Sequence, residues 1–177
     1  MIINSIGPGQ NIPDDINVVI EIPAYSDPVK YEMDKKTGTL VVNRFMATAM
    51  FYPCNYGYIP QTLATDSDPV DVLVITPFPL LSSSVIQCRP IGILKMKDEA
   101  GDDNKILAVP NDKTTDLYRN IKSYQDMSET LLHSIHHFFE HYKELEAGKW
   151  VKIEGWFGPE VAKQEITDGV KRYSGAP

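Results

Sequence analysis

Apolar runs rich in β-branched and aromatic residues predict a mostly β protein. Such runs extend from Asn17 to Ile22, Asp71 to Ile75, Val85 to Met96, Lys105 to Val109 and Trp150 to Trp156. Short connections containing Pro, Gly or Ser separate them, and no helical pattern alternates regularly with them. A doubly wound parallel sheet is therefore not expected, and the pattern predicts a small, mostly antiparallel barrel.

A β-hairpin is predicted between the first and second of these runs. The segment from Val29 to Asp34 alternates polar and apolar residues, residues 35–38 have turn chemistry, and an apolar run from Leu40 to Arg44 follows. Because side chains alternate along a strand, Lys30 and Glu32 should share one face of the hairpin.

An aromatic segment from Phe51 to Pro60 follows the hairpin. It holds three tyrosines together with two prolines and one glycine. Proline and glycine disfavour a helix, so an ordered, partly extended loop is expected.

Two amphipathic helices are expected in the second half of the chain. The longer should run from about Ser128 to Leu145, with Ser128 or Asp126 as its N-cap and Gly148 just beyond its end. Its apolar stripe comprises Leu131, Leu132, Ile135, Phe138, Phe139, Tyr142 and Leu145. The shorter should begin at Pro159 and lead into a frayed tail from Ser174 to Pro177.

Length and composition favour one domain, covering residues 1–177. A chain of 177 residues with 42% hydrophobic content can bury one core, and no repeat or linker divides it. The first residues resemble neither an export signal nor a membrane span, so a cytoplasmic protein without membrane contact is expected. Cys54 and Cys88 lack metal-ligand spacing and should be reduced core thiols.

The charge balance bears on the choice of ligand. Seventeen basic residues against twenty-four acidic residues give a formal net charge of −7. This excess argues against a nucleic-acid-binding protein, which would neutralise phosphates with lysine and arginine. If the protein handles phosphate, metal ions are expected to help.

The densest candidate chemistry lies in the segment Asp66-Ser67-Asp68-Pro69-Val70-Asp71, directly before an apolar strand. Three carboxylates brought close together require cations between them. The spacing does not fit an EF-hand calcium loop. A plainer interpretation makes Asp66 and Asp68 ordinary turn formers, although it does not account for Asp71 at the start of a buried strand.

A second acidic group occupies residues 98–103, where a strand should end in a turn. On its own, this group would be read as a solvated turn. Together with the first group, it supplies the oxygen-rich ligand set that Mg²⁺ prefers.

Both groups, with the aromatic segment, resemble the soluble family I inorganic pyrophosphatases. The resemblance extends from Pro13 to Trp156, and Ser67 stands where glycine is often found in that family. The matching positions are Glu21, Lys30, Glu32, Arg44, Tyr52, Tyr56, Asp66, Asp68, Asp71, Asp98, Asp103, Lys105, Tyr142 and Lys143.

The resemblance implies a fold and an assembly. The expected fold is mainly β with flanking helices (α+β), a five-stranded closed OB-like barrel with two main α-helices. Chains of this short, bacterial type form homohexamers, built as dimers of trimers. His137 and His141 match positions at the contact between trimers, where protonation would weaken a symmetric interface.

The resemblance also implies an activity, the magnesium-dependent hydrolysis of inorganic diphosphate to two orthophosphates by a metal-activated water. Asp66, Asp71 and Asp103 would be the chief Mg²⁺ ligands, joined by Asp98, and Asp68 would be the general base.

The resemblance assigns the remaining residues to the substrate and its surroundings. Lys30, Arg44, Lys143, Tyr56 and Tyr142 would bind the substrate, with Lys30, Arg44 and Tyr56 also counted as catalytic. The supporting residues would be Glu21, Glu32, Tyr52 and Lys105.

Three other interpretations stay open. His133, His137 and His141 recur at helical spacing and could bind a transition metal, although no further ligand at matching spacing completes such a site. A metal-dependent phosphohydrolase of another phosphate compound would need a pocket for a base or sugar, and no motif for one is present. A non-catalytic barrel-type module could bind metal through the same acidic loops.

Overall fold

Seven strands form the main sheet of the protein. The computed structural model describes residues 5–34 and 36–175. The strands of this sheet are β1 (Ile16–Ile22), β4 (Asn55–Tyr58), β5 (Asp71–Val74), β6 (Val85–Asp98), β7 (Gly101–Asp102), β8 (Lys105–Pro110) and β9 (Val151–Phe157).

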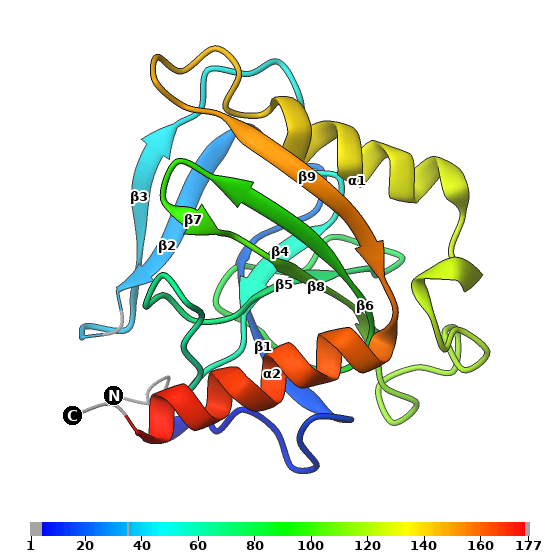
Figure 1. The fold of residues 1–177 in the computed structure, drawn as a ribbon. Helices are drawn as coiled ribbons and strands as arrows, with labels where there is room; N and C mark the ends of the chain where they lie inside the picture. The colour runs from blue at the N-terminus through cyan, green and yellow to red at the C-terminus, as the bar shows by residue number, and fades with distance from the viewer. Residues whose placement is uncertain (1–4, 35, 176–177) are drawn as a thin grey trace.

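Five of these strands close into a ring, as expected. The order is β1, β4, β5, β8 and β6, and β6 pairs back onto β1 (Figure 1). Strands β5 and β8 are parallel, and the other pairs in the ring are antiparallel. Strands β7 and β9 attach to β6, whose 14 residues extend beyond the ring.

The predicted hairpin is confirmed, and it forms a separate two-stranded sheet beside the ring. It consists of β2 (Val29–Asp34) and β3 (Thr39–Phe45), with Lys30 directly opposite Arg44 (Figure 1). The ammonium of Lys30 lies 2.6 Å from a carboxylate oxygen of Glu32, so these side chains do share a face. Lys35, in the predicted turn, lies outside the described residues.

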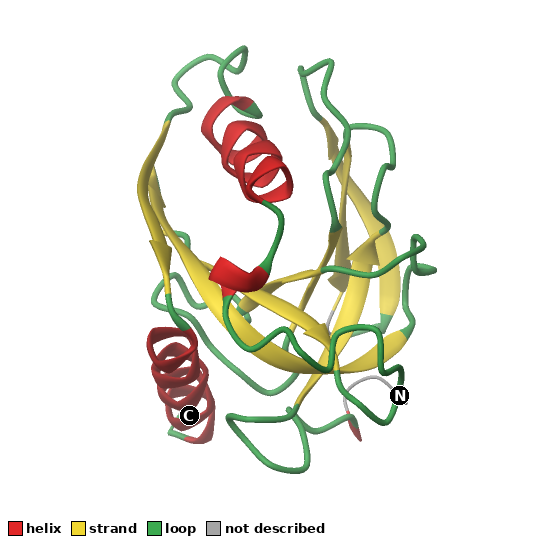
Figure 2. Ribbon diagram, turned by 90° about the vertical axis from the view of Figure 1, so that its right-hand side faces the viewer, coloured by secondary structure: helices red, strands yellow, loops and turns green. Residues whose placement is uncertain are grey.

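The two main helices cover different apolar surfaces of the strands. Alternate residues of the strands divide between two buried clusters. Leu73 and Leu107 pack in the cluster that contains Phe138 and Phe139 of α1 (Glu129–His141). The neighbouring strand residues pack in the cluster that contains Ile166 of α2 (Pro159–Ser174), at the opposite end of the molecule (Figure 2).

The longer helix is shorter than predicted. It ends at His141, and the next residues form turns in which Glu144 N–H bonds to the His141 carbonyl at 3.0 Å. Leu145, predicted to lie on the apolar stripe, is 75% exposed. Tertiary contacts override the periodicity here, because buried Lys143 pairs with Asp98 instead of continuing the helix.

The predicted caps are only partly confirmed. Ser128 is the N-cap of α1 by position, but its side chain makes no capping hydrogen bond. Asp126 belongs instead to the capping box of the short 3₁₀ helix η2 (Tyr124–Asp126), because its carboxylate accepts from Ser123 N–H at 2.9 Å. Helix α2 starts at Pro159 as expected and includes Ser174, so it extends into the predicted tail, and residues 176–177 lie outside the described range.

The aromatic segment contains a strand that the sequence pattern did not predict. Strand β4 lies within it, is fully buried and joins β1 to β5. Glycine is needed at position 57, since a Cβ there would lie 2.0 Å from the Val19 carbonyl oxygen. The glycine therefore allows β4 to approach β1 closely and to pair within the ring.

Two further expectations can be compared with the structure. Cys54 and Cys88 are buried free thiols, as predicted. Across residues 5–34 and 36–175, no helix is both long and apolar enough to cross a membrane.

Candidate active site

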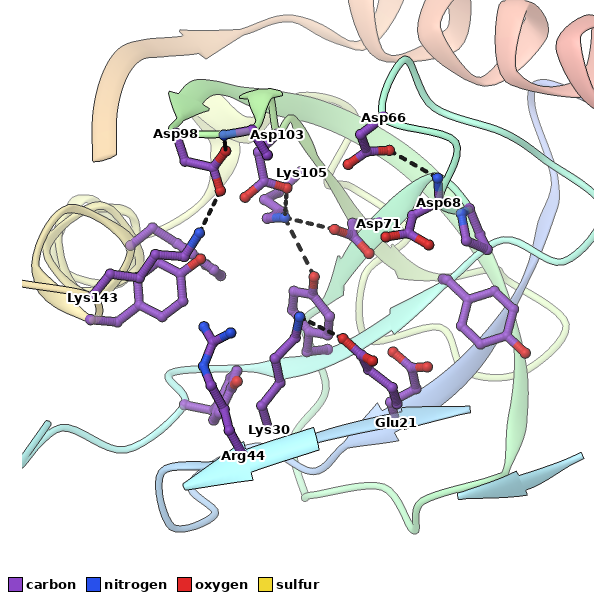
Figure 3. Close-up of a pocket in the computed structure, with 18 of the residues that line it drawn as sticks. Glu21, Lys30, Arg44, Asp66, Asp68, Asp71, Asp98, Asp103, Lys105 and Lys143 are labelled. Carbon is purple, nitrogen blue, oxygen red and sulfur yellow. Dashed lines mark hydrogen bonds and ion pairs between the residues drawn. The ribbon is translucent and has the colours of Figure 1, made fainter. Parts of the chain in front are cut away.

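One cavity of about 270 Å³ brings together every residue that the sequence nominated as a site residue. It lies between the hairpin, the ends of the ring strands and the turn after α1 (Figure 3). The nominated residues that line it are Glu21, Lys30, Glu32, Arg44, Tyr52, Tyr56, Asp66, Asp68, Asp71, Asp98, Asp103, Lys105, Tyr142 and Lys143.

A buried ammonium group lies among the carboxylates. Asp71 and Lys105 begin the parallel neighbours β5 and β8 and are direct register partners. The Lys105 Nζ donates to Asp71 Oδ2 at 2.6 Å and also to Asp103 Oδ1. Tyr56 completes its surroundings, with the hydroxyl oxygen 3.4 Å from Nζ (Figure 3).

Burial and neighbouring charges shift the pKa values of Asp71 and Lys105 in opposite directions. Burial raises the pKa of Asp71 even though Lys105 opposes the shift. For Lys105, burial alone would lower the pKa, but Asp103 and Asp71 hold it well above its usual value. The ammonium therefore stays charged and balances two carboxylates that would otherwise repel each other.

The turn before β5 carries Asp66 and Asp68. Asp66 Oδ1 accepts from the Asp68 N–H at 3.0 Å, so Asp66 is a turn former that also faces the cavity. Burial raises the pKa of Asp66. Ser67 lies between them with φ of 73°, the left-handed region that favours glycine, which explains why glycine would suit this position.

Asp98 ends β6 and pairs with Lys143 in the turn after α1. Its second oxygen accepts from the Ala100 N–H at 2.8 Å. Burial raises the pKa of Asp98, but these donors outweigh it and hold the pKa below its usual value. Asp98 is therefore an ionised carboxylate in the wall of the cavity.

Lys30 and Arg44 enter the cavity from the hairpin, opposite the acidic turn (Figure 3). Lys30 pairs with Glu32, and the Arg44 Nε lies 3.5 Å from Glu146 Oε1. Together with Lys143, they form a basic side of the cavity that faces Asp66, Asp68 and Asp71, although Glu32 pairs with Lys30 and Asp98 with Lys143 within it.

Tyrosine rings form the base of the cavity and pack against α1. Tyr142 lies 5.4 Å from Phe139 and from Phe138, centroid to centroid, and Tyr52 lies 4.8 Å from Phe138. Burial raises the pKa of Tyr56 and of Tyr142, so both hydroxyls stay neutral and can donate a hydrogen bond.

Glu21 is a carboxyl group buried in the cavity wall. Its Oε1 accepts from the Met33 N–H at 2.7 Å and so joins β1 to the hairpin. Burial raises the pKa of Glu21 to about 7.

Sequence reasoning missed three charged residues at this site. Glu99 and Lys149 line the cavity and pair at 2.6 Å, and Glu99 also lies 3.9 Å from Lys143. Glu146 contacts Arg44 from outside the cavity lining. Glu99 stands beside Asp98 in the acidic run, which was a usable signal, whereas Lys149 and Glu146 lie in a charged turn with no distinguishing pattern.

The donors at this site are suited to Mg²⁺. The acidic side presents the carboxylate oxygens of several aspartates, the ligand type that Mg²⁺ prefers. In the described ranges, no three His, Cys, Asp or Glu side chains gather closely enough to form a ready-made metal cage. Mg²⁺ ordinarily keeps several waters and takes only one or two carboxylates, so dispersed donors of this kind fit it. This finding also gives no support to a transition-metal site at His133, His137 and His141.

Comparisons with known proteins agree on one family. The family model described as inorganic pyrophosphatase matches residues 18–174. The inorganic pyrophosphatase of Yersinia pestis is 59% identical over 172 residues, which cover 97% of this chain and 98% of that protein. That of Escherichia coli K12 is 61% identical over 164 residues, 93% of each chain. A solved inorganic pyrophosphatase from Coxiella burnetii has a TM-score of 0.92 at 52% identity, covering 95% of this chain and 99% of that one.

Proposed function

This chain belongs to the inorganic pyrophosphatase family and hydrolyses inorganic diphosphate, and we propose that it does so in the described cavity with Mg²⁺ as cofactor. The observation that supports this site is the opposition of acidic and basic side chains across one cavity of about 270 Å³. Diphosphate is a small polyanion, so the basic side suits the substrate and the acidic side suits cations.

The carboxylates that would hold Mg²⁺ are those of Asp66, Asp71, Asp98 and Asp103. When bound, Mg²⁺ supplies positive charge that neutralises phosphoryl oxygens and makes a nearby water more acidic. Asp71 and Asp103 already share a cation, the Lys105 ammonium, which supports their assignment as cation ligands.

Asp68 is the proposed general base. It faces the cavity from the turn between Asp66 and Asp71, so it lies beside the proposed metal ligands. A carboxylate in that place can accept the proton of the attacking water.

The basic side holds the substrate and steadies the departing orthophosphate. Arg44 offers a planar fork of donors, and Lys30 and Lys143 act as point charges. The neutral hydroxyls of Tyr56 and Tyr142 add hydrogen bonds without adding charge. The supporting residues act around them: Glu32 pairs with Lys30, Lys105 pairs with Asp71 and Asp103, Glu21 joins β1 to the hairpin, and Tyr52 packs beside Tyr56.

The protein is further proposed to be cytoplasmic and to assemble as a homohexamer, a dimer of trimers, with neither nucleic acid nor membrane as partner. Its formal net charge of −7 supports the exclusion of nucleic acid. His137 and His141, whose rings lie 4.7 Å apart on α1, are proposed to lie at the contact between trimers.

The test of this function is orthophosphate release from three substrates: diphosphate, a nucleoside triphosphate and a sugar phosphate. The expected result is release from diphosphate alone, at a rate that falls to background when a chelator removes Mg²⁺. Comparable release from the triphosphate would favour a broader phosphohydrolase. A protein that binds Mg²⁺ but releases nothing would be a metal-binding module.

A further inference from the structure

Glu146 contacts one cation of the active site without lining the cavity itself. Its Oε1 lies 3.5 Å from the Arg44 Nε, and its side chain is only 18% exposed. Among the described residues, neither of these two buried atoms has a hydrogen-bond partner. An ion pair that is buried without hydrogen bonds contributes little net stability, so its main effect is on where the guanidinium lies.

The hairpin alone does not fix the position of Arg44. Strand β3 is largely exposed, and an arginine side chain loses considerable rotamer freedom when it is ordered. Lys30 is its direct cross-strand partner, and like charges in that arrangement repel each other. Lys30 has Glu32 on its own strand at 2.6 Å, whereas Arg44 takes its carboxylate partner from a distant part of the chain.

Glu146 is itself held in the turn that carries Lys143. The Glu146 N–H donates to the Lys143 carbonyl at 3.0 Å, and the Lys149 N–H donates to the Glu146 carbonyl at 3.2 Å. Lys143 is anchored in turn by Asp98. Glu146 therefore connects Arg44 of the hairpin to the turn that supplies Lys143, another cation of the cavity.

We propose that Glu146 is a positioning residue for diphosphate binding. It holds the Nε edge of Arg44, so that the two terminal nitrogens of the guanidinium face the cavity (Figure 3). The inference rests on the proposed role of Arg44 in binding diphosphate. Glu146 touches no phosphate and acts only through Arg44.

The substitution Glu146→Gln keeps the shape of the side chain and removes its charge. The expected result is a rise in KM for diphosphate of about fivefold, the size of a partly buried ion pair, with kcat changed less than twofold. Calorimetry of orthophosphate binding should show the same loss of affinity without turnover. Glu160→Gln, at an 86% exposed side chain on α2, is the matched control and should change neither quantity.

A double-mutant cycle with Arg44→Ala separates positioning from a general structural effect. If Glu146 acts through Arg44, adding Glu146→Gln to Arg44→Ala should raise KM no further. An additive rise, or an unchanged KM in Glu146→Gln, would overturn the inference. A wild-type protein that releases no orthophosphate would instead refute the proposed function. Orthophosphate calorimetry would still test whether Glu146 acts through Arg44 in that case.

Discussion

Lys105 is the residue that makes the acidic side of the cavity possible without added cations. Its side chain is 3% exposed and lies between Asp71 and Asp103. The rings of Tyr56 and Phe139 face the same ammonium at 5.5 and 6.0 Å. Two carboxylates thus share one internal positive charge, which Mg²⁺ would supplement or replace.

Replacing Lys105 with methionine should destabilise the metal-free protein more than the Mg²⁺-loaded protein. Loss of one partner from a buried ion pair costs about 3 kcal/mol, and in chelator nothing else balances Asp71 and Asp103. Urea unfolding in chelator and in excess Mg²⁺ measures the difference. Lys97→Met, at a 49% exposed lysine, is the control. Equal destabilisation in both media would show that Lys105 contributes packing alone.

Glu21 should make stability depend on pH. Its pKa is about 7 in the folded protein, against 4.5 for an exposed glutamate side chain, so the folded state binds the proton more tightly. The resulting stability is present below pH 4.5 and is lost as pH rises to 7. Glu21→Gln cannot ionise and should not lose this stability. Its free energy of unfolding, relative to that of wild type, should therefore rise by up to about 3 kcal/mol from pH 5 to pH 8.

The measurement for Glu21 is urea unfolding of both proteins at the two pH values, in chelator. Glu160→Gln serves as the control, because its carboxylate is exposed and remote from the cavity. A constant difference between Glu21→Gln and wild type from pH 5 to pH 8 would mean that Glu21 titrates normally.

At this scale the site residues were nominated through a family resemblance, carried by the order and spacing of matching residues, and not through charge alone. All fourteen nominated residues line one cavity because strand starts and turns bring them there. Glu146 and Lys149 could not be predicted, because a charged residue in a turn looks the same whether it faces solvent or another ion. The contact of Glu146 with Arg44 spans about a hundred residues and exists only in the folded chain.

At the scale of elements, β4 and the segments around it are held by one buried amide. The Asn55 side chain accepts from the Ala24 N–H at 3.0 Å and from the Leu80 N–H at 2.9 Å. It donates to the Val74 carbonyl at 3.0 Å and to Thr76 Oγ1 at 2.7 Å. This side chain therefore joins the ends of β1, β5 and the following loop directly beside Tyr56.

The substitution Asn55→Ala should cost about 3 kcal/mol of unfolding free energy, because it leaves several buried polar groups without partners. Urea unfolding measures the loss. Asn43→Ala, which removes a single exposed hydrogen bond to Glu32, should cost less than about 1 kcal/mol. Similar costs at the two positions would mean that water replaces the Asn55 contacts.

The strands and helices were largely predictable, and the exceptions have physical causes. Period-two and helical patterns located the hairpin, β6, β8 and α2 within one or two residues. Strand β4 was missed because Pro53 and Gly57 are residues that disfavour strands. The need for glycine at position 57 follows only from the close approach of β1, which the sequence does not show. The end of α1 was misplaced because the Lys143 contact with Asp98, rather than apolar periodicity, determines the path of the chain.

On the scale of the whole molecule, the two helices pack against different sides of the ring, and the cavity lies on the side of α1. Helix α1 packs in the cluster that includes Tyr52, Tyr56 and Tyr142, all of which also line the cavity. Helix α2 packs in the other cluster, away from the cavity. Topology thus places Asp71 at the start of β5, Asp98 at the end of β6 and Asp103 just before β8, all in the cavity that Lys30 and Arg44 of the hairpin also line.

Acid should dissociate the proposed hexamer into trimers. Protonation of His137 and His141 would add positive charge to both sides of a symmetric contact, only partly offset by Glu140 and Glu144 beside His141. Sedimentation at pH 8 and pH 5 measures the assembly. The double variant His137→Gln/His141→Gln should lose most of this dependence, and retention of the hexamer at pH 5 in wild type would exclude the mechanism.

The decisive experiment for this active site is orthophosphate release from diphosphate as Mg²⁺ is titrated, with wild type and Asp68→Asn side by side. Wild type should be inactive in chelator and become active as Mg²⁺ is added. Asp68→Asn should bind Mg²⁺ by calorimetry and yet lose at least about a hundredfold in rate, the usual contribution of a general base. Equal rates in the two proteins would show that Asp68 is not the general base.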